Sequence, residues 1–123
     1  MDKAKILYQL WSGFGWNAYD ETSAPTGTNR PKLPYITYEV RTDDFGHEVA
    51  LTASVWTQSS SWISAENKAD EIEEFISRGG IICGNGRVRA WIKRGSPFRF
   101  RMTDEKDNSV KRIVINYTAE FID

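Results

Sequence analysis

The sequence predicts an α+β fold in which an antiparallel β-sheet packs against two α-helices. Apolar residues recur at helical spacing over residues 2–12 and 63–78, whereas apolar and polar residues alternate over 33–40, 48–57 and several segments between 81 and 122. This order favours helices on one face of an antiparallel sheet. The 123 residues show no repeat or boundary, so we expect one domain over 1–123.

The N-terminal part predicts a short amphipathic helix and then a long loop. The helix is expected over 2–12, with its apolar residues at helical spacing and Gly13 after its end. The run TSAPTGTNRPK, from Thr22 to Lys32, is rich in residues that favour turns and has little to bury. We therefore expect a flexible loop over 22–33, which either is mobile or orders only against a partner.

The middle of the chain predicts a β-hairpin and then the second helix. Ile36, Tyr38 and Val40 share one face of the first strand, and in the second strand Trp56 lies on the face opposite Leu51 and its apolar neighbours. For the helix over 63–78, both Ser61 and Ser64 are candidate N-caps, and Gly79–Gly80 provide its end.

The C-terminal part predicts a β-meander of three or four segments. Residues 81–83 and 87–93 flank the Gly84-Asn85-Gly86 turn, and PFRFRM, residues 97–102, alternates again. The last strand is expected over 110–122, with a single apolar face formed by Ile113, Ile115, Tyr117, Ala119 and Phe121.

Composition favours a globular protein of a reducing cytoplasm. The chain is 40% hydrophobic and 27% charged, and no segment is apolar over the roughly 18 residues that a membrane span needs. Charges interrupt the N-terminus where a signal peptide would be apolar, and a single cysteine, Cys83, excludes an intramolecular disulfide. We expect no membrane contact.

The sequence offers little catalytic chemistry. His47 and Cys83 are the only residues of their types, so one chain cannot form a His/Cys metal cluster or a Cys/His nucleophilic pair. GGIICGNG lacks the Lys-Ser/Thr of a phosphate-binding loop, and DEIEE is typical of a solvated helix face. We expect no enzymatic activity, no catalytic residue, no metal and no cofactor.

Basic residues concentrate in one segment. Of 16 basic and 17 acidic residues in the chain, residues 87–112 hold nine and three, respectively. Arg87, Arg89, Trp91 and Lys93 are expected on one strand face, which Arg99 and Arg101 extend. This surface fits single-stranded nucleic acid, an acidic neighbouring subunit, or a solvated hairpin face. The mildly acidic pI of about 5.9 weighs against nucleic acid.

The aromatic residues raise a second choice between core and interface. Trp56 points away from the apolar strand face, and Trp62 precedes the second helix as a staple or a rim residue. Either the second helix folds over Trp56, or Tyr35, Trp56, Trp62 and Trp91 form an exposed aromatic area typical of protein interfaces.

The order of elements resembles the tail-terminator, or tail-to-head joining, proteins of long-tailed bacteriophages and tail-like particles. Pro34, Tyr35, Ile36, Tyr38 and the SVW…S run at 54–59 carry most of the resemblance, which covers nearly the whole chain as a pattern of elements, not as a diagnostic motif. Other neck or tail components fit less well, because adaptors are mainly helical, stoppers are mainly β-barrels and tube subunits have longer strands.

The resemblance implies a structural virion protein that forms a ring, expected to be a hexamer, on the last ring of the tail tube. The implied partners are other copies of the chain, the tail tube protein and a head-neck connector, with DNA passing through the lumen unrecognised. Assembly would occur in the host cytoplasm, and the ring would remain in the tail or neck. Candidate contacts are Tyr35, Trp56, Trp62 and Trp91 for packing, Arg87, Arg89, Arg99 and Arg101 for ion pairs, and Arg30 and Lys32 in the loop.

Overall fold

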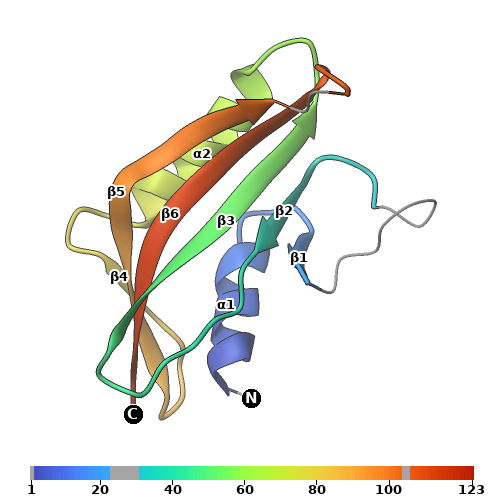
Figure 1. Ribbon diagram of the computed structural model, residues 1–123. Coiled ribbons are helices and arrows are strands. Elements are labelled where there is room, and N and C mark those ends of the chain that lie inside the picture. Colours follow the sequence, from blue (N-terminus) through green and yellow to red (C-terminus); the bar gives the residue numbers. More distant parts are fainter. Residues whose placement is uncertain (1, 23–30, 104–105) are drawn as a thin grey trace.

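The described part of the chain forms two helices and a six-stranded sheet (Figure 1). This computed structural model describes residues 2–22, 31–103 and 106–123. The predicted flexible loop falls largely outside the described residues. The elements are α1 (Asp2–Ser12), β1 (Ala18–Asp20), β2 (Tyr35–Tyr38), β3 (Glu48–Gln58), α2 (Ile63–Phe75), β4 (Ile81–Cys83), β5 (Arg89–Thr103) and β6 (Val110–Ile122).

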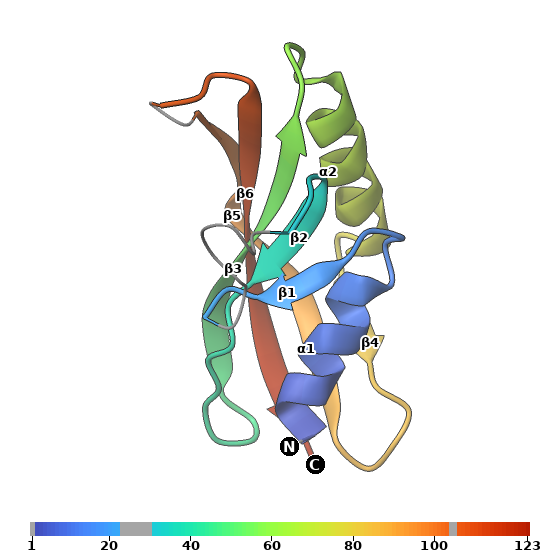
Figure 2. The same ribbon diagram turned by 90° about the vertical axis from the view of Figure 1, so that its right-hand side faces the viewer.

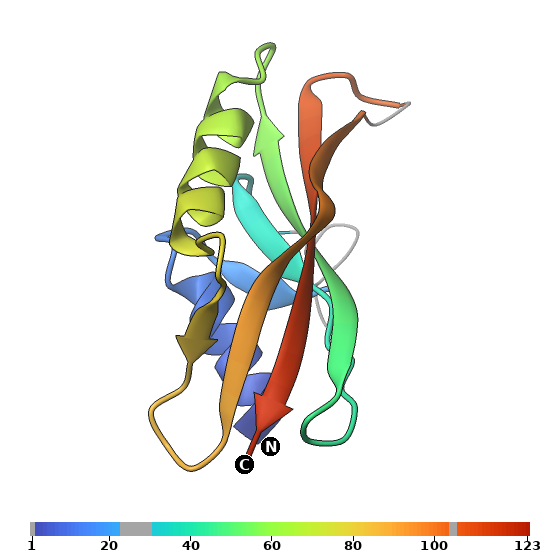
Figure 3. The same ribbon diagram turned by 90° about the vertical axis from the view of Figure 1, so that its left-hand side faces the viewer.

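The sheet confirms the predicted α+β class. Its strand order is β1-β2-β3-β6-β5-β4, and every neighbouring pair is antiparallel except β1 and β2, which are parallel. Both the β2–β3 hairpin and the C-terminal β4–β5–β6 meander are confirmed. Figures 2 and 3 show both helices on the same face of a curved, twisted sheet, which leaves an outer face without helices.

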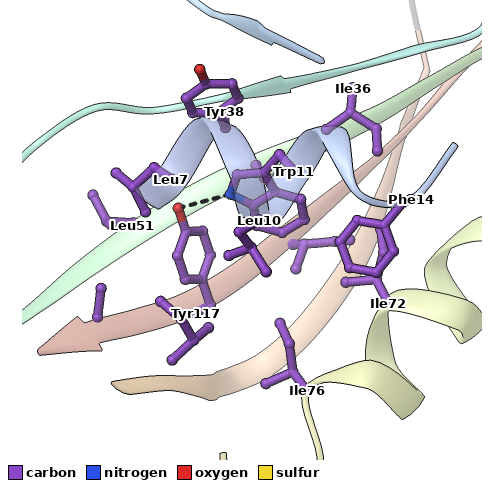
Figure 4. Close-up of a cluster of buried hydrophobic side chains, with 14 of the residues drawn as sticks. Leu7, Leu10, Trp11, Phe14, Ile36, Tyr38, Leu51, Ile72, Ile76 and Tyr117 are labelled. Atoms are coloured by element: carbon purple, nitrogen blue, oxygen red, sulfur yellow. Dashed lines mark hydrogen bonds between the residues drawn. The ribbon is translucent and has the colours of Figure 1, made fainter. Parts of the chain in front are cut away.

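The core lies between the two helices and the inner face of the sheet. Leu7 and Trp11 of α1, Ile72 of α2 and Tyr117 of β6 are all almost fully buried (Figure 4). The Trp11 indole nitrogen donates a hydrogen bond of 3.2 Å to the Tyr117 hydroxyl, and the two rings meet edge to face. This pair fixes α1 across the central strands.

α2 ends at Phe75, three residues before the predicted end, because its last carbonyls bind a side chain of the sheet. The Arg94 guanidinium donates to the backbone oxygens of Glu73 and Ile76, which satisfies groups that a helix end leaves unpaired. At the other end, Trp62 holds the N-cap position without a side-chain cap. The Ser61 hydroxyl accepts a hydrogen bond from the amide of Ile63 instead, at 3.1 Å.

β5 is one long strand with a bulge, where separate segments were predicted. It advances from Arg94 to Arg99 while β6 advances only from Tyr117 to Ile115. Gly95 lies in this bulge, where an added Cβ would come within 2.8 Å of the Asn116 backbone. β5 therefore has an odd number of extra residues in this interval. As a result, odd-numbered side chains of β5 lie on one face of the sheet before the bulge and on the other face after it.

Candidate assembly surfaces

A row of side chains crosses the outer face of the sheet on four neighbouring strands. Strand register places Tyr35 beside Trp56, Trp56 beside Arg112, and Arg112 beside Met102. In the next row, Val114 pairs with Phe100. We call Trp56, Phe100, Met102, Arg112 and Val114 the outer-face patch.

Contacts within the chain hold the centre of this patch. The Trp56 indole nitrogen donates to the Thr37 hydroxyl at 2.9 Å, and the Arg112 guanidinium lies 4.6 Å from the Trp56 ring centroid. Arg112 also donates to the Ser54 hydroxyl at 3.0 Å. Burial lowers the pKa of the Arg112 guanidinium, and no carboxylate lies within 4 Å of it among the described residues. The patch therefore holds a partly desolvated cation.

The structure excludes one of the two predictions for Trp56 and places Tyr35 in the interior. Because α2 lies on the other face, the alternative that the second helix covers Trp56 is wrong. Trp56 does point outward, but it is half-buried by its neighbours. Tyr35 is buried, at 6% exposure, since Tyr19 of β1 and Trp56 pack against its ring. Sequence reasoning missed β1, a strand of only three residues, and hence this cover.

Trp62 also has partners within the chain. The Arg101 guanidinium lies 4.7 Å from its ring centroid and the Lys111 ammonium lies 5.5 Å from it. These cation–π contacts join the start of α2 to β5 and β6. Trp62 thus packs against the core as a partly buried residue.

Arg99 and Arg101 do not extend the basic surface as predicted. The bulge in β5 turns them to the helix face, away from Trp91 and Lys93. There Arg99 lies 2.6 Å from Asp70, and Arg101 lies 2.7 Å from Glu66, both on α2. Their ion pairs to an acidic surface are therefore formed with the chain's own helix.

The remaining predicted basic residues lie at the end of the sheet where β5 begins and β6 ends. Arg87 pairs with Asp123 at 2.6 Å, and the Arg89 guanidinium donates to the carbonyl of Gly86 at 3.3 Å. Lys93 lies over the Trp91 ring at 4.4 Å and pairs with Glu48 at 3.0 Å. The Trp91 indole nitrogen donates to the carbonyl of Gly79 at 3.1 Å. These groups remain partly or fully exposed.

A groove that the sequence did not predict lies where α1, α2 and β4 meet. Its volume is about 610 Å³. β4 is the last strand of the sheet, so one of its edges is open, and Figure 3 shows it on the same side as both helices. Phe75 and Ile82 are exposed here, at 46% and 51%. We call this feature the groove; its lining includes Ile6, Gln9, Leu10, Phe14, Glu71, Glu74, Phe75, Ile81, Ile82 and Cys83.

The groove joins apolar walls to an acidic rim. Phe75 meets Phe14 edge to face at 5.3 Å, and burial raises the pKa of the Cys83 thiol. On the rim, Glu71 pairs with Lys68 at 2.9 Å, whereas Glu74 has no cation within 4 Å among the described residues. Sequence reasoning missed the groove because its walls come from three separated segments.

The remaining candidate sites are small. Lys32 is exposed, and Arg30 lies outside the described residues. Asp43, Asp44 and His47 bring three potential ligand atoms within 4.8 Å of one another at an exposed turn, an arrangement that is common without an ion. No helix in the described ranges is long and apolar enough to cross a membrane.

Comparison with known proteins finds likeness in structure and not in sequence. No family model matches the chain, and no curated protein matches it. A chain of a solved structure described as "Virion of native gene transfer agent (GTA) particle" superposes with a TM-score of 0.55. The two share 20% sequence identity, and the match covers 91% of this chain and 83% of that chain. This chain therefore shares its fold with a component of a virion particle.

Proposed function

We propose that this chain is a structural virion protein that forms a ring, expected to be a hexamer, on the end of a phage-type tail tube. The ring would stop tube growth, join the tail to the head neck and leave a lumen for DNA. It would assemble in the host cytoplasm and catalyse no reaction. The observation that carries the proposal is the shared fold with a virion chain, which extends over 91% of this chain.

The resemblance to tail-terminator proteins supports the finer role independently. The residues that carry it, which are Pro34, Tyr35, Ile36, Tyr38 and the run from Ser54 to Ser59, lie in or directly beside the paired strands β2 and β3. Exposed apolar groups on the outer-face patch and in the groove give such a subunit surfaces for contact with neighbours.

The division of the basic surface weighs against the alternative of single-stranded nucleic-acid binding. A strand of nucleic acid needs cations and aromatic rings along one continuous surface. Arg99 and Arg101 lie on the opposite face of β5 from Trp91 and Lys93, and their charges meet α2 carboxylates. Salt-dependent retention of the protein on an oligonucleotide column would instead favour binding of single-stranded nucleic acid.

The proposed function is tested by mixing the gold-labelled chain with purified tail tubes of its own particle that lack it. Negative-stain images should show label at one end of each tube and none along the sides. The control is the same tube already carrying the unlabelled chain, which should bind no label. Label along the tube wall, or no binding to either end, would contradict the proposal.

A further inference from the structure

Two exposed apolar surfaces of this chain lie on different sides of the molecule. The outer-face patch, with Phe100 and Met102 at 44% and 43% exposure, lies on the sheet face without helices. The groove, with Phe75 and Ile82, is lined by residues of α1, α2 and β4, and Figures 2 and 3 show both helices on the other face of the sheet. Neither surface is closed by the described part of the chain.

The two surfaces carry opposite charges that lack ion-pair partners. Arg112, at the centre of the outer-face patch, has no carboxylate within 4 Å among the described residues, although the more distant Glu21 acts on it electrostatically. Glu74, on the groove rim, likewise has no cation within 4 Å in the described ranges. A carboxylate that contacts a partly desolvated guanidinium can accept a charge-assisted hydrogen bond from it, so each surface offers the group that the other lacks.

The surfaces also match in form. The groove is a hollow with apolar walls, whereas Phe100 and Met102 are large side chains that stand on a strand next to Arg112. Aromatic and Met side chains that fill a pocket, with a charged pair beside them, are typical of the centre of a protein interface.

We propose that the outer-face patch of one copy docks into the groove of the next copy, with Arg112 of the first facing Glu74 of the second. This inference rests on the proposed function and names the contact that would link the subunits of the ring. Because the two surfaces differ, the contact is heterologous and repeats from copy to copy until the ring closes.

Two variants break the two surfaces separately. The groove variant carries Glu74→Arg and Ile82→Lys, both at exposed positions, with the new arginine near a helix C-terminus where cations are favourable. The patch variant carries Phe100→Ser and Met102→Ser, which remove the apolar side chains and leave Arg112 in place, so that the two mutated surfaces do not attract each other in a mixture. Tyr8→Lys is the matched control, because Tyr8 is 52% exposed and lies outside both surfaces.

The decisive measurement is the mass of each variant and of their mixture by analytical ultracentrifugation at high protein concentration. Wild type and Tyr8→Lys should form rings. Each surface variant alone should stay monomeric, with association weakened by about thirtyfold or more, as for loss of interface anchors. The equimolar mixture should form a one-to-one dimer and nothing larger, since one intact groove and one intact patch remain between the two chains.

Each other result overturns the inference. Rings formed by either surface variant, a mixture that stays monomeric while wild type assembles, or a wild type that never associates would each exclude this contact. Circular dichroism and thermal unfolding identify a variant that fails to fold, and Phe100→Thr with Met102→Thr then replaces the patch variant. Labelling of tube ends is scored separately, so the proposed function can stand when this contact fails.

Discussion

At the scale of single residues, the buried Trp11–Tyr117 pair joins α1 to the central strand β6. Both side chains are almost completely buried, and the indole of Trp11 donates to the Tyr117 hydroxyl at 3.2 Å. Burial raises the pKa of Tyr117, so its hydroxyl stays neutral across the physiological range. The hydrogen bond is therefore present over that whole range.

We predict that Tyr117→Phe lowers the free energy of unfolding by about 1–3 kcal/mol, because it leaves the Trp11 indole N–H buried without an acceptor. Urea unfolding followed by tryptophan fluorescence measures the loss. Tyr8→Phe is the control, since Tyr8 is 52% exposed and its hydroxyl has no hydrogen-bond partner among the described residues. Equal midpoints for the two variants would show that the buried bond contributes nothing.

The thiol of Cys83 gives a second prediction at this scale. Burial raises its pKa, and only the thiolate reacts with alkylating reagents. Alkylation of the folded chain should therefore be slower at pH 8 than alkylation of the chain unfolded in urea, and its rate should still rise above the ordinary thiol pKa of about 8.5. Mass spectrometry of timed samples measures both rates. A folded rate that levels off below pH 8 would contradict the prediction.

At the scale of elements, ion pairs hold α2 against β5. Arg99 lies 2.6 Å from Asp70, 3.8 Å from Glu66 and 3.7 Å from Glu73, so one cation faces three carboxylates of the helix. α2 is acidic along its exposed side, and β5 supplies cations where the helix crosses it. This arrangement uses charges within the chain that the sequence had suggested for a neighbour.

We predict a coupling of about 0.5 kcal/mol between Arg99 and Asp70 in a double-mutant cycle of Arg99→Met and Asp70→Asn. The pair is partly exposed, so the coupling should shrink as salt rises from about 0.1 to 1 M. Chemical unfolding in urea at both salt concentrations measures it. A coupling that is absent at low salt, or unchanged at high salt, would show that this ion pair does not stabilise the packing of α2 against β5.

The bulge in β5 gives the second element-scale prediction. Gly95→Ala places a Cβ 2.8 Å from backbone atoms of Asn116, which cannot move without disturbing the β5–β6 pairing. We expect a loss of about 1–3 kcal/mol in unfolding free energy. Gly86→Ala is the matched control, because nothing lies within 4 Å of its added Cβ. Similar stability of the two variants in thermal unfolding would show that the bulge tolerates a side chain.

The sequence predicts the longer, regularly patterned elements well and the short or irregular ones poorly. Clear periodicity was sufficient for α1, β3, β6 and the antiparallel order of the sheet. β1 was missed because three residues carry no period, and the faces of Arg99 and Arg101 were wrong because a bulge reverses the alternation. The groove was missed because helical and strand periods say nothing of how α1, α2 and β4 meet.

At the scale of the whole molecule, less aromatic surface is free than the sequence suggested. Tyr35 is buried, and Trp56, Trp62 and Trp91 each have partners within the chain. The strongly exposed apolar side chains lie elsewhere, and four of them belong to the outer-face patch and the groove: Phe75, Ile82, Phe100 and Met102. These four side chains are therefore the candidate apolar contacts of the molecule.

The most direct test of the tail-end role is electron microscopy of particles produced without this chain. We predict tail tubes of variable, excessive length that are not joined to heads, because nothing would stop tube growth or bind the neck. Adding back the purified chain should restore joining. Particles that lack the chain and still carry tails of uniform length attached to heads would contradict the account.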